Sequence, residues 1–215
     1  PEAFVNMLAF LGWNPGTEQE LFTMEELIQH FSFEHVHKAG ARFDPEKAKW
    51  FNEQYLRKQT AETLAKRLLP VVKSKFNLGD ADVKISSDYL VKAVTLLKDR
   101  VQFESELIEK GSYLFLAPDV YDEQVLAKKW KPELGSFFNA LIENLSSLTE
   151  FNSVAVDTTI KSTAATSGIK PGEIMQLLRV FVSGQGAGVD LIGMLELFGK
   201  NEVIERLNKA LKKVN

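Results

Sequence analysis

The sequence predicts an all-α protein. Apolar residues recur with the helical period of about 3.6 residues in most segments, as at Leu90, Val94 and Leu97. No run alternates apolar and polar residues for long enough to build a sheet. Residue types that begin and end helices lie between the periodic segments. We therefore expect helices joined by short turns, without an internal repeat or a low-complexity tract.

The first helices are predicted from their ends. Residues 2–11 are apolar-rich and are followed by Gly12 and an Asn-Pro-Gly turn, which predicts that a helix ends there. Thr23 followed three residues later by Glu26 is a capping box, which predicts that the next helix begins between them.

The third and fourth helices have equally clear starts. Asp44 before Pro45 predicts an N-cap with proline at the first helical position, and a helix to about residue 58. On this helix the aromatic residues Trp50, Phe51 and Tyr55 are expected in the core. Thr60 is predicted to cap a helix that ends near residue 73, with a kink at Pro70.

The rest of the chain continues the pattern. Residues 77–80 break the chain, and Ser86 or Ser87 begins a helix. Residues 113–118 form a short apolar turn region. Further helices are predicted at about 122–130, 133–149, 153–167, 171–183, 189–198 and 200–213. Most of the fifteen phenylalanines have helical core spacing, among them Phe137, Phe138 and Phe181.

Composition is that of an ordinary globular protein. The 215 residues suffice for one large or about two to three small domains, and 45% are hydrophobic and 26% charged. The lack of cysteine excludes disulfides and thiolate metal sites, and it fits a reducing cytosol. We find no apolar run of the roughly 20 residues that span a bilayer, and no signal peptide. Because the chain starts at Pro1 in mid-pattern, we expect an excised fragment.

Charge is segregated along the chain. Residues 1–37 carry a net charge of −6, residues 38–75 carry +6, and the remainder carries −3. A basic segment of this kind favours a polyanionic partner. The alternative is that residues 44–75 form two helices whose basic side chains only face water.

Catalytic and metal-binding motifs are absent from the sequence. It contains no nucleophile elbow, zinc-protease motif or Walker lysine. His30, His35 and His37 lack a carboxylate or thiolate at a ligand spacing, so we interpret them as solvated histidines. The glycine-rich segment 183–188 invites comparison with a phosphate loop. It follows a helix and lacks the Lys-Ser/Thr ending, so a flexible turn between helices is favoured.

Two segments carry a family resemblance. Residues 1–13 with 22–57, and residues 168–211, resemble bacterial glutamyl-tRNA synthetases, in the region that follows their second ATP-binding signature. The intervening residues 76–160 are placed by their position. The two ATP signatures of that family, of the His-Ile-Gly-His and Lys-Met-Ser-Lys-Ser types, do not occur in these residues.

The resemblance implies three helical parts. Residues 1–63 would form a stem-contact domain at the inside corner of the L-shaped tRNA. Residues 64–117 and 118–215 would form two anticodon-binding subdomains.

The resemblance also implies anticodon contacts. Arg100 matches an arginine that reads the third anticodon base and favours cytosine, which suits a guanidinium fork. The alternative is that Arg100 pairs with Asp99 or Glu104 on a helix surface. The other matched positions are Gln176, Arg179, Leu191 and Lys161. Gln176 and Arg179 lie one turn apart and can face one ligand together.

The sequence departs from the family at Lys161 and at two positions beside the other matched residues. Leu177 and Val189 each replace a proline, which puts base readout by this loop in doubt. Lys161 replaces an arginine, so it keeps the attraction to phosphate but loses the planar fork.

The stem-contact part has its own candidates. Phosphate contacts supply affinity and little sequence information. The residues expected to make them are Lys38, Arg42, Lys47, Lys49 and Arg57.

The resemblance finally implies a function. The chain would be the tRNA-binding part of a cytoplasmic, monomeric glutamate–tRNA ligase whose partner is tRNA(Glu). ATP with Mg²⁺ would act in the missing catalytic domain, and no cofactor would bind this fragment, which should be inactive alone. Two other readings stay open. One is a helical protein-interaction module without RNA binding, and the other is a ligase that charges both glutamate and glutamine tRNAs.

Overall fold

The computed structural model describes residues 2–37, 40 and 42–214. Within these residues no strand forms, and Trp13 and Val36 make one isolated bridge. The all-α prediction is confirmed. The α-helices are α1 Glu2–Gly12, α2 Met24–His30, α3 Pro45–Lys58, α4 Ala61–Phe76, α5 Ser87–Leu97, α6 Glu104–Glu109, α7 Glu123–Lys129, α8 Leu134–Ser146, α9 Ser153–Thr166, α10 Pro171–Ser183 and α11 Leu191–Val214. The short 3₁₀ helices are η1 Phe33–His35, η2 Val83–Ile85, η3 Lys98–Arg100 and η4 Ser112–Leu114.

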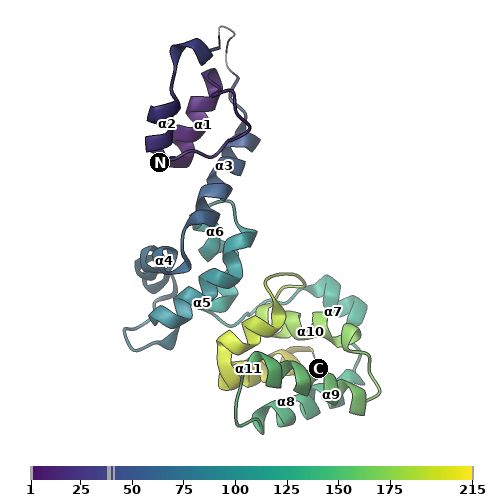
Figure 1. Cartoon of the computed structure of the whole chain (residues 1–215). Helices are drawn as coiled ribbons and strands as arrows, with labels where there is room; N and C mark the ends of the chain where they lie inside the picture. Colours follow the sequence, from purple (N-terminus) through teal and green to yellow (C-terminus); the bar gives the residue numbers. More distant parts are fainter. Residues whose placement is uncertain (1, 38–39, 41, 215) are drawn as a thin grey trace.

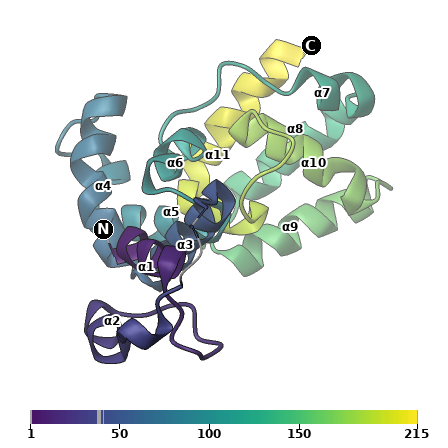
Figure 2. The ribbon, with the colours of Figure 1, turned by 90° about the horizontal axis from the view of Figure 1, so that it is seen from above.

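The molecule is elongated (Figure 1). Helices α1–α3 form its upper part, α4–α6 a middle part, and α7–α11 a larger lower part. Seen from above, α4 and the α7–α11 group lie on opposite sides of α1–α3 (Figure 2). In the described ranges every helix is too short or too polar to cross a lipid bilayer.

Helix starts agree with the sequence prediction. The Thr23 hydroxyl accepts from the Glu26 amide at 3.2 Å, and the Glu26 carboxylate accepts from the Thr23 amide at 2.7 Å. One carboxylate oxygen of Asp44 accepts from the amides of Glu46 and Lys47. Both caps satisfy amides that would otherwise lack an intrahelical partner. The predicted starts at residues 24 and 45 are confirmed.

Three details differ from the prediction. Helix α4 runs on through Pro70 to Phe76 and ends where Asn77 adopts a left-handed conformation. Helix α6 was not expected, because six residues are too few to show a period. Trp50 and Tyr55 are only half-buried, since they lie at the margin of a small core. The two helices predicted at 189–198 and 200–213 are confirmed as the two halves of α11, which meet at Gly199, where the backbone is not helical (φ 74°).

Most buried apolar side chains fall into two clusters. The upper cluster contains Ala3, Met7 and Phe51, with half-buried aromatic neighbours. The second cluster is much larger and runs without a break from Leu56 to Leu211. Helix α3 contributes to both, so one continuous helix joins the upper part to the rest of the molecule.

A buried polar network joins the middle and lower parts. Arg206 of α11 is 1% exposed and donates to the carbonyl oxygens of Tyr113 (2.7 Å) and Val182 (2.6 Å). Its Nε also donates to Glu202 at 2.8 Å. Lys84 of η2 lies 3.2 Å from the same carboxylate oxygen. Residues from four elements are thereby held around one guanidinium.

Candidate nucleic-acid interface

A hollow of about 350 Å³ lies beside the connection between α10 and α11. Its lining includes Gln176 and Arg179 of α10 and Leu191 at the start of α11, three of the positions that the resemblance assigned to the anticodon. The other lining residues are Gly172, Met175, Gly186, Asp190 and Ile192. The fold therefore brings these three residues to one place.

Gln176 and Arg179 point toward the same segment, as their spacing on a helix predicts. The Gln176 side-chain amide donates to the carbonyl oxygen of Gly186 at 3.2 Å. One guanidinium nitrogen of Arg179 donates to the carbonyl oxygen of Val189 at 2.6 Å. Both acceptors belong to the connection between α10 and α11, so part of the hydrogen-bonding capacity of each side chain is already used.

Arg100 is exposed at the end of η3 and belongs to the same region. Burial lowers the pKa of Arg179, and the positive charge of Arg100 lowers it further. Burial raises the pKa of Tyr113, which the charges of Arg179 and Arg100 partly offset. These shared effects place Arg100, Arg179 and Tyr113 within electrostatic reach of one another.

The alternative that Arg100 pairs with a neighbouring carboxylate is wrong for this structure. Glu104 instead receives two hydrogen bonds from Arg67, at 2.9 and 2.8 Å. Among the residues with described positions, Arg100 makes no ion pair with Asp99 either. Its charge is therefore available to an anion or to a base.

Leu191 and Lys161 fit their expected roles less directly. Leu191 is 4% exposed and packs with the large core, so a base could touch only the edge of its side chain. Lys161 lies on α9, outside the residues that line the hollow, and its ammonium is 2.5 Å from the Asp157 carboxylate. A contact of either residue with RNA stays a prediction.

The stem-contact candidates do not share one face. Lys47 pairs with Glu20 at 3.0 Å, whereas Lys49 pairs with Glu46 at 2.7 Å. Two residues along a helix correspond to a rotation of roughly 200°, so these two lysines leave α3 in different directions. Arg42 is exposed, and Lys38 lies outside the described residues.

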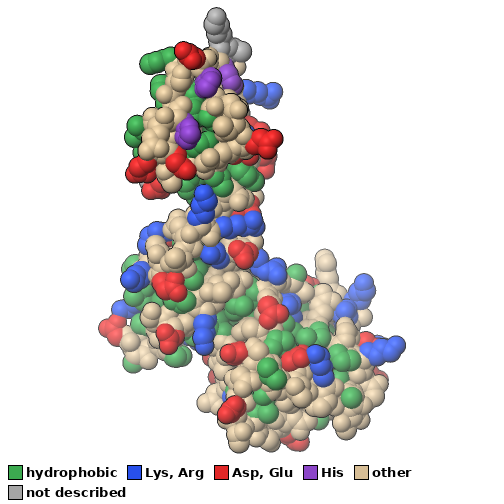
Figure 3. All heavy atoms as spheres, in the orientation of Figure 1, with side chains coloured by type: hydrophobic (Ala, Val, Ile, Leu, Met, Phe, Trp, Pro, Cys, Tyr) green, Lys and Arg blue, Asp and Glu red, His purple; other side chains and the backbone are tan. Residues whose placement is uncertain are grey.

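Arg57 connects the stem-contact candidates to Arg100. It pairs with Glu53 at 2.6 Å and donates to the carbonyl oxygen of Asp99, the residue before Arg100, at 3.3 Å. Basic side chains gather on the visible face at the narrow junction below α1–α3, and acidic side chains surround the upper part (Figure 3). The segregation in the sequence is thus also a segregation in space. Exposed pairs of this kind contribute little stability, so phosphate can replace the carboxylate at small cost.

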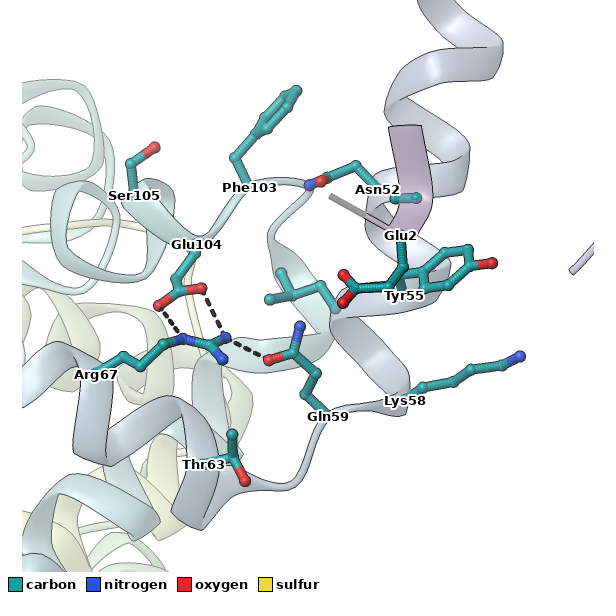
Figure 4. Close-up of a pocket in the computed structure, with 12 residues that line it drawn as sticks. Glu2, Asn52, Tyr55, Lys58, Gln59, Thr63, Arg67, Phe103, Glu104 and Ser105 are labelled. Atoms are coloured by element: carbon teal, nitrogen blue, oxygen red, sulfur yellow. Dashed lines mark hydrogen bonds and ion pairs between the residues drawn. The ribbon is translucent and has the colours of Figure 1, made fainter. Parts of the chain in front are cut away.

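A second hollow, of about 880 Å³, lies at this junction (Figure 4). Its polar groups bond to one another: Arg67 bridges Glu104 and the side-chain oxygen of Gln59. Among the residues with a described position, none of those predicted to contact RNA lines it. We interpret it as the joint between the end of α3 and the start of α4.

Two further points complete the site. No group of three or more histidine, aspartate or glutamate side chains that could hold a metal ion occurs within the described ranges. Tyr113 is a residue of the site that the sequence did not predict. The sequence placed it only in a short apolar turn region, and no neighbouring residue indicates that the fold brings it to Arg179.

Comparison with known proteins agrees with this geometry. A family model described as an anticodon binding domain matches residues 46–211. The glutamate–tRNA ligase of Flavobacterium psychrophilum is 42% identical over 98% of this chain, and that of Cytophaga hutchinsonii is 41% identical over 98%. The chain spans 41% and 40% of the lengths of these relatives.

Solved structures give the same result. The crystal structure of a glutamate tRNA ligase from Elizabethkingia meningosepticum superimposes with a TM-score of 0.91 at 36% identity, over 100% of this chain and 41% of that one. The resemblance to glutamyl-tRNA synthetases is confirmed, and with the family match over most of its length the chain belongs to the anticodon-binding domain family.

Proposed function

We propose that this chain provides the tRNA-binding part of a glutamate–tRNA ligase. The observation that carries the proposal is the meeting of Gln176, Arg179 and Leu191 at one hollow in a chain of this family, with the charge of Arg100 near enough to act on Arg179. The partner would be tRNA(Glu), and the whole enzyme, a cytoplasmic monomer, would use ATP with Mg²⁺ to activate glutamate. The described residues would position and select the RNA.

The three parts would divide this work. In the proposed division, residues 1–63 contact the stem, and residues 64–117 and 118–215 hold the anticodon loop. The last two share one continuous core, which favours their acting as a unit. Arg57 lies where the stem-contact and anticodon surfaces meet. The family match favours this function over a protein-interaction module, which no feature of the described surface specifically supports.

We expect weak binding of tRNA(Glu) by the 215-residue chain, with an affinity that falls as salt rises. Each phosphate that is neutralised should contribute roughly 0.7–0.9 to the slope of log affinity against log salt. Fluorescence anisotropy with labelled tRNA over a series of KCl concentrations measures this slope. Binding that does not change with salt would contradict the phosphate contacts.

Replacing Arg100 should relax selection at the third anticodon base. By analogy with groove readout, losing a bidentate contact should remove about 1–3 kcal/mol of preference for cytosine in Arg100→Gln. The measurement compares the affinities of tRNA variants that differ only at this base. Lys75→Gln on α4 removes a charge from an exposed lysine elsewhere and serves as the control. Equal preference in wild type and Arg100→Gln would remove Arg100 from the readout.

A further inference from the structure

The connection between α10 and α11, residues 184–190 (the α10–α11 loop), is fixed by donors from outside it. Its carbonyl oxygens at Gly184, Gly186 and Val189 each accept a hydrogen bond. The donors are the Asp122 amide (2.9 Å), the Gln176 side chain (3.2 Å) and the Arg179 guanidinium (2.6 Å). The segment expected to be a flexible turn therefore has most of its carbonyl oxygens satisfied.

The glycines of the α10–α11 loop explain how it can lie so close to its neighbours. A Cβ on Gly184, whose φ is +79°, would lie 2.6 Å from the Val120 carbonyl oxygen. A Cβ on Gly186 would lie 2.7 Å from a Val125 methyl carbon, and one on Gly188 would lie 3.2 Å from the Tyr113 hydroxyl. At Gly184 and Gly186 a larger residue would force a neighbouring group to shift, and at Gly188 it would make a tight contact.

The residues between these glycines face the other way. Gln185 and Ala187 are exposed, whereas the glycines on either side of them are half-buried. Gln185 also lines a hollow of about 250 Å³ with Tyr113 and the apolar residues Leu116 and Val120, which are 49% and 75% exposed. A glutamine amide both donates and accepts, so it can bond to a base edge beside an apolar surface.

We propose that Gln176 and Arg179 are positioning residues that hold the α10–α11 loop, and that Gln185 on the outer side of this loop contacts the nucleotide. This inference rests on the proposed function. It assigns selection of the base to Arg100 and a positioning role to Gln176 and Arg179, because one donor of each already bonds to the backbone of the loop. Gln185 would extend the interface from the 350 Å³ hollow into the 250 Å³ hollow, which Tyr113 also lines.

Hydrogen–deuterium exchange of the free chain tests the positioning role without RNA. In Gln176→Leu and in Arg179→Met, exchange of the backbone amides in residues 184–190 should rise at least about fivefold, as expected when a net hydrogen bond is lost. Gln124→Leu, which changes an exposed glutamine on α7, should leave this exchange unchanged. Exchange that stays at the wild-type rate in both α10 variants would overturn the positioning role.

Binding of anticodon stem–loop hairpins tests the role of Gln185. Gln185→Ala should weaken binding at least about fivefold while the exchange of the α10–α11 loop is unchanged. Gln176→Leu should weaken all hairpins by one common factor, whatever their third anticodon base. A change of base preference in Gln176→Leu with unaltered loop exchange, or full binding by Gln185→Ala, would overturn the assignment. If the wild-type chain binds no hairpin, the proposed function and the Gln185 contact both fail, and the exchange experiment still decides the positioning role.

Discussion

Arg206→Met should lower the free energy of unfolding by about 3–5 kcal/mol, the range measured when one member of a buried ion pair is removed. The guanidinium of Arg206 is 1% exposed and makes hydrogen bonds to two carbonyl oxygens and one carboxylate. Methionine fills much of the same volume next to Phe198 but offers no donor. The carbonyl oxygens of Tyr113 and Val182 would stay buried without that partner, which is the costly part of the change.

Urea denaturation of the two proteins measures this loss. Lys212→Met on the exposed side of the same helix is the matched control, because it also replaces a basic residue by methionine. The control should stay within about 0.5 kcal/mol of wild type, as is usual for surface changes. A loss of less than about 1 kcal/mol in Arg206→Met would mean that the network adds nothing beyond what packing supplies.

The acid dependence of unfolding reports on the same network. Burial raises the pKa of Glu202, but the charges and hydrogen bonds of Arg206 and Lys84 outweigh it, and the pKa falls below the usual 4.5. A carboxyl whose pKa is lowered by folding stabilises the protein above its unfolded pKa. That stability is lost as the pH falls through the folded pKa. Arg206→Met should therefore show a weaker loss of stability below pH 4.5 than wild type.

Local signals in the sequence predicted much of the fold. The capping box of Thr23 and Glu26 and the Asp44–Pro45 start need only residues three or four positions apart, so they are readable without a structure. Helix α6 escaped prediction because it is shorter than two helical turns. The burial of Arg206 could not be predicted from the sequence either, because the Tyr113 carbonyl oxygen that accepts its hydrogen bond is 93 residues away.

The candidate site was also predictable only in part, because some of its features depend on contacts between distant residues. The family resemblance indicated Gln176, Arg179 and Arg100, and the fold brings all three to one region. The resemblance says nothing about how their donors are used. That Gln176 and Arg179 bond to the backbone of residues 184–190 depends on how the chain turns after α10. The scatter of Lys47 and Lys49 follows from their spacing on one helix, although their common charge suggested one surface.

Phe181→Ala should be the other strongly destabilising change, with an expected loss of about 3–5 kcal/mol in the free energy of unfolding. Phe181 of α10 is fully buried, and its ring centroid lies 4.7 Å from that of Phe138 and 5.5 Å from that of Trp130. Removing the ring leaves a cavity between α8 and α10. Other contacts keep these two helices apart, so they cannot move together to fill the cavity.

Phe181→Leu distinguishes the energetic cost of a cavity from the cost of losing the aromatic ring. Leucine keeps most of the apolar volume and should cost less than alanine, if filling the space between α8 and α10 is what matters. Val154→Ala, at a position that is 77% exposed, should be close to wild type in the same urea titration. Equal losses in the alanine and leucine variants would contradict the cavity argument, because a cost set by unfilled volume must fall as the volume is restored. The support for α10, the helix that carries Gln176 and Arg179, would then come from the ring contacts with Phe138 and Trp130 themselves.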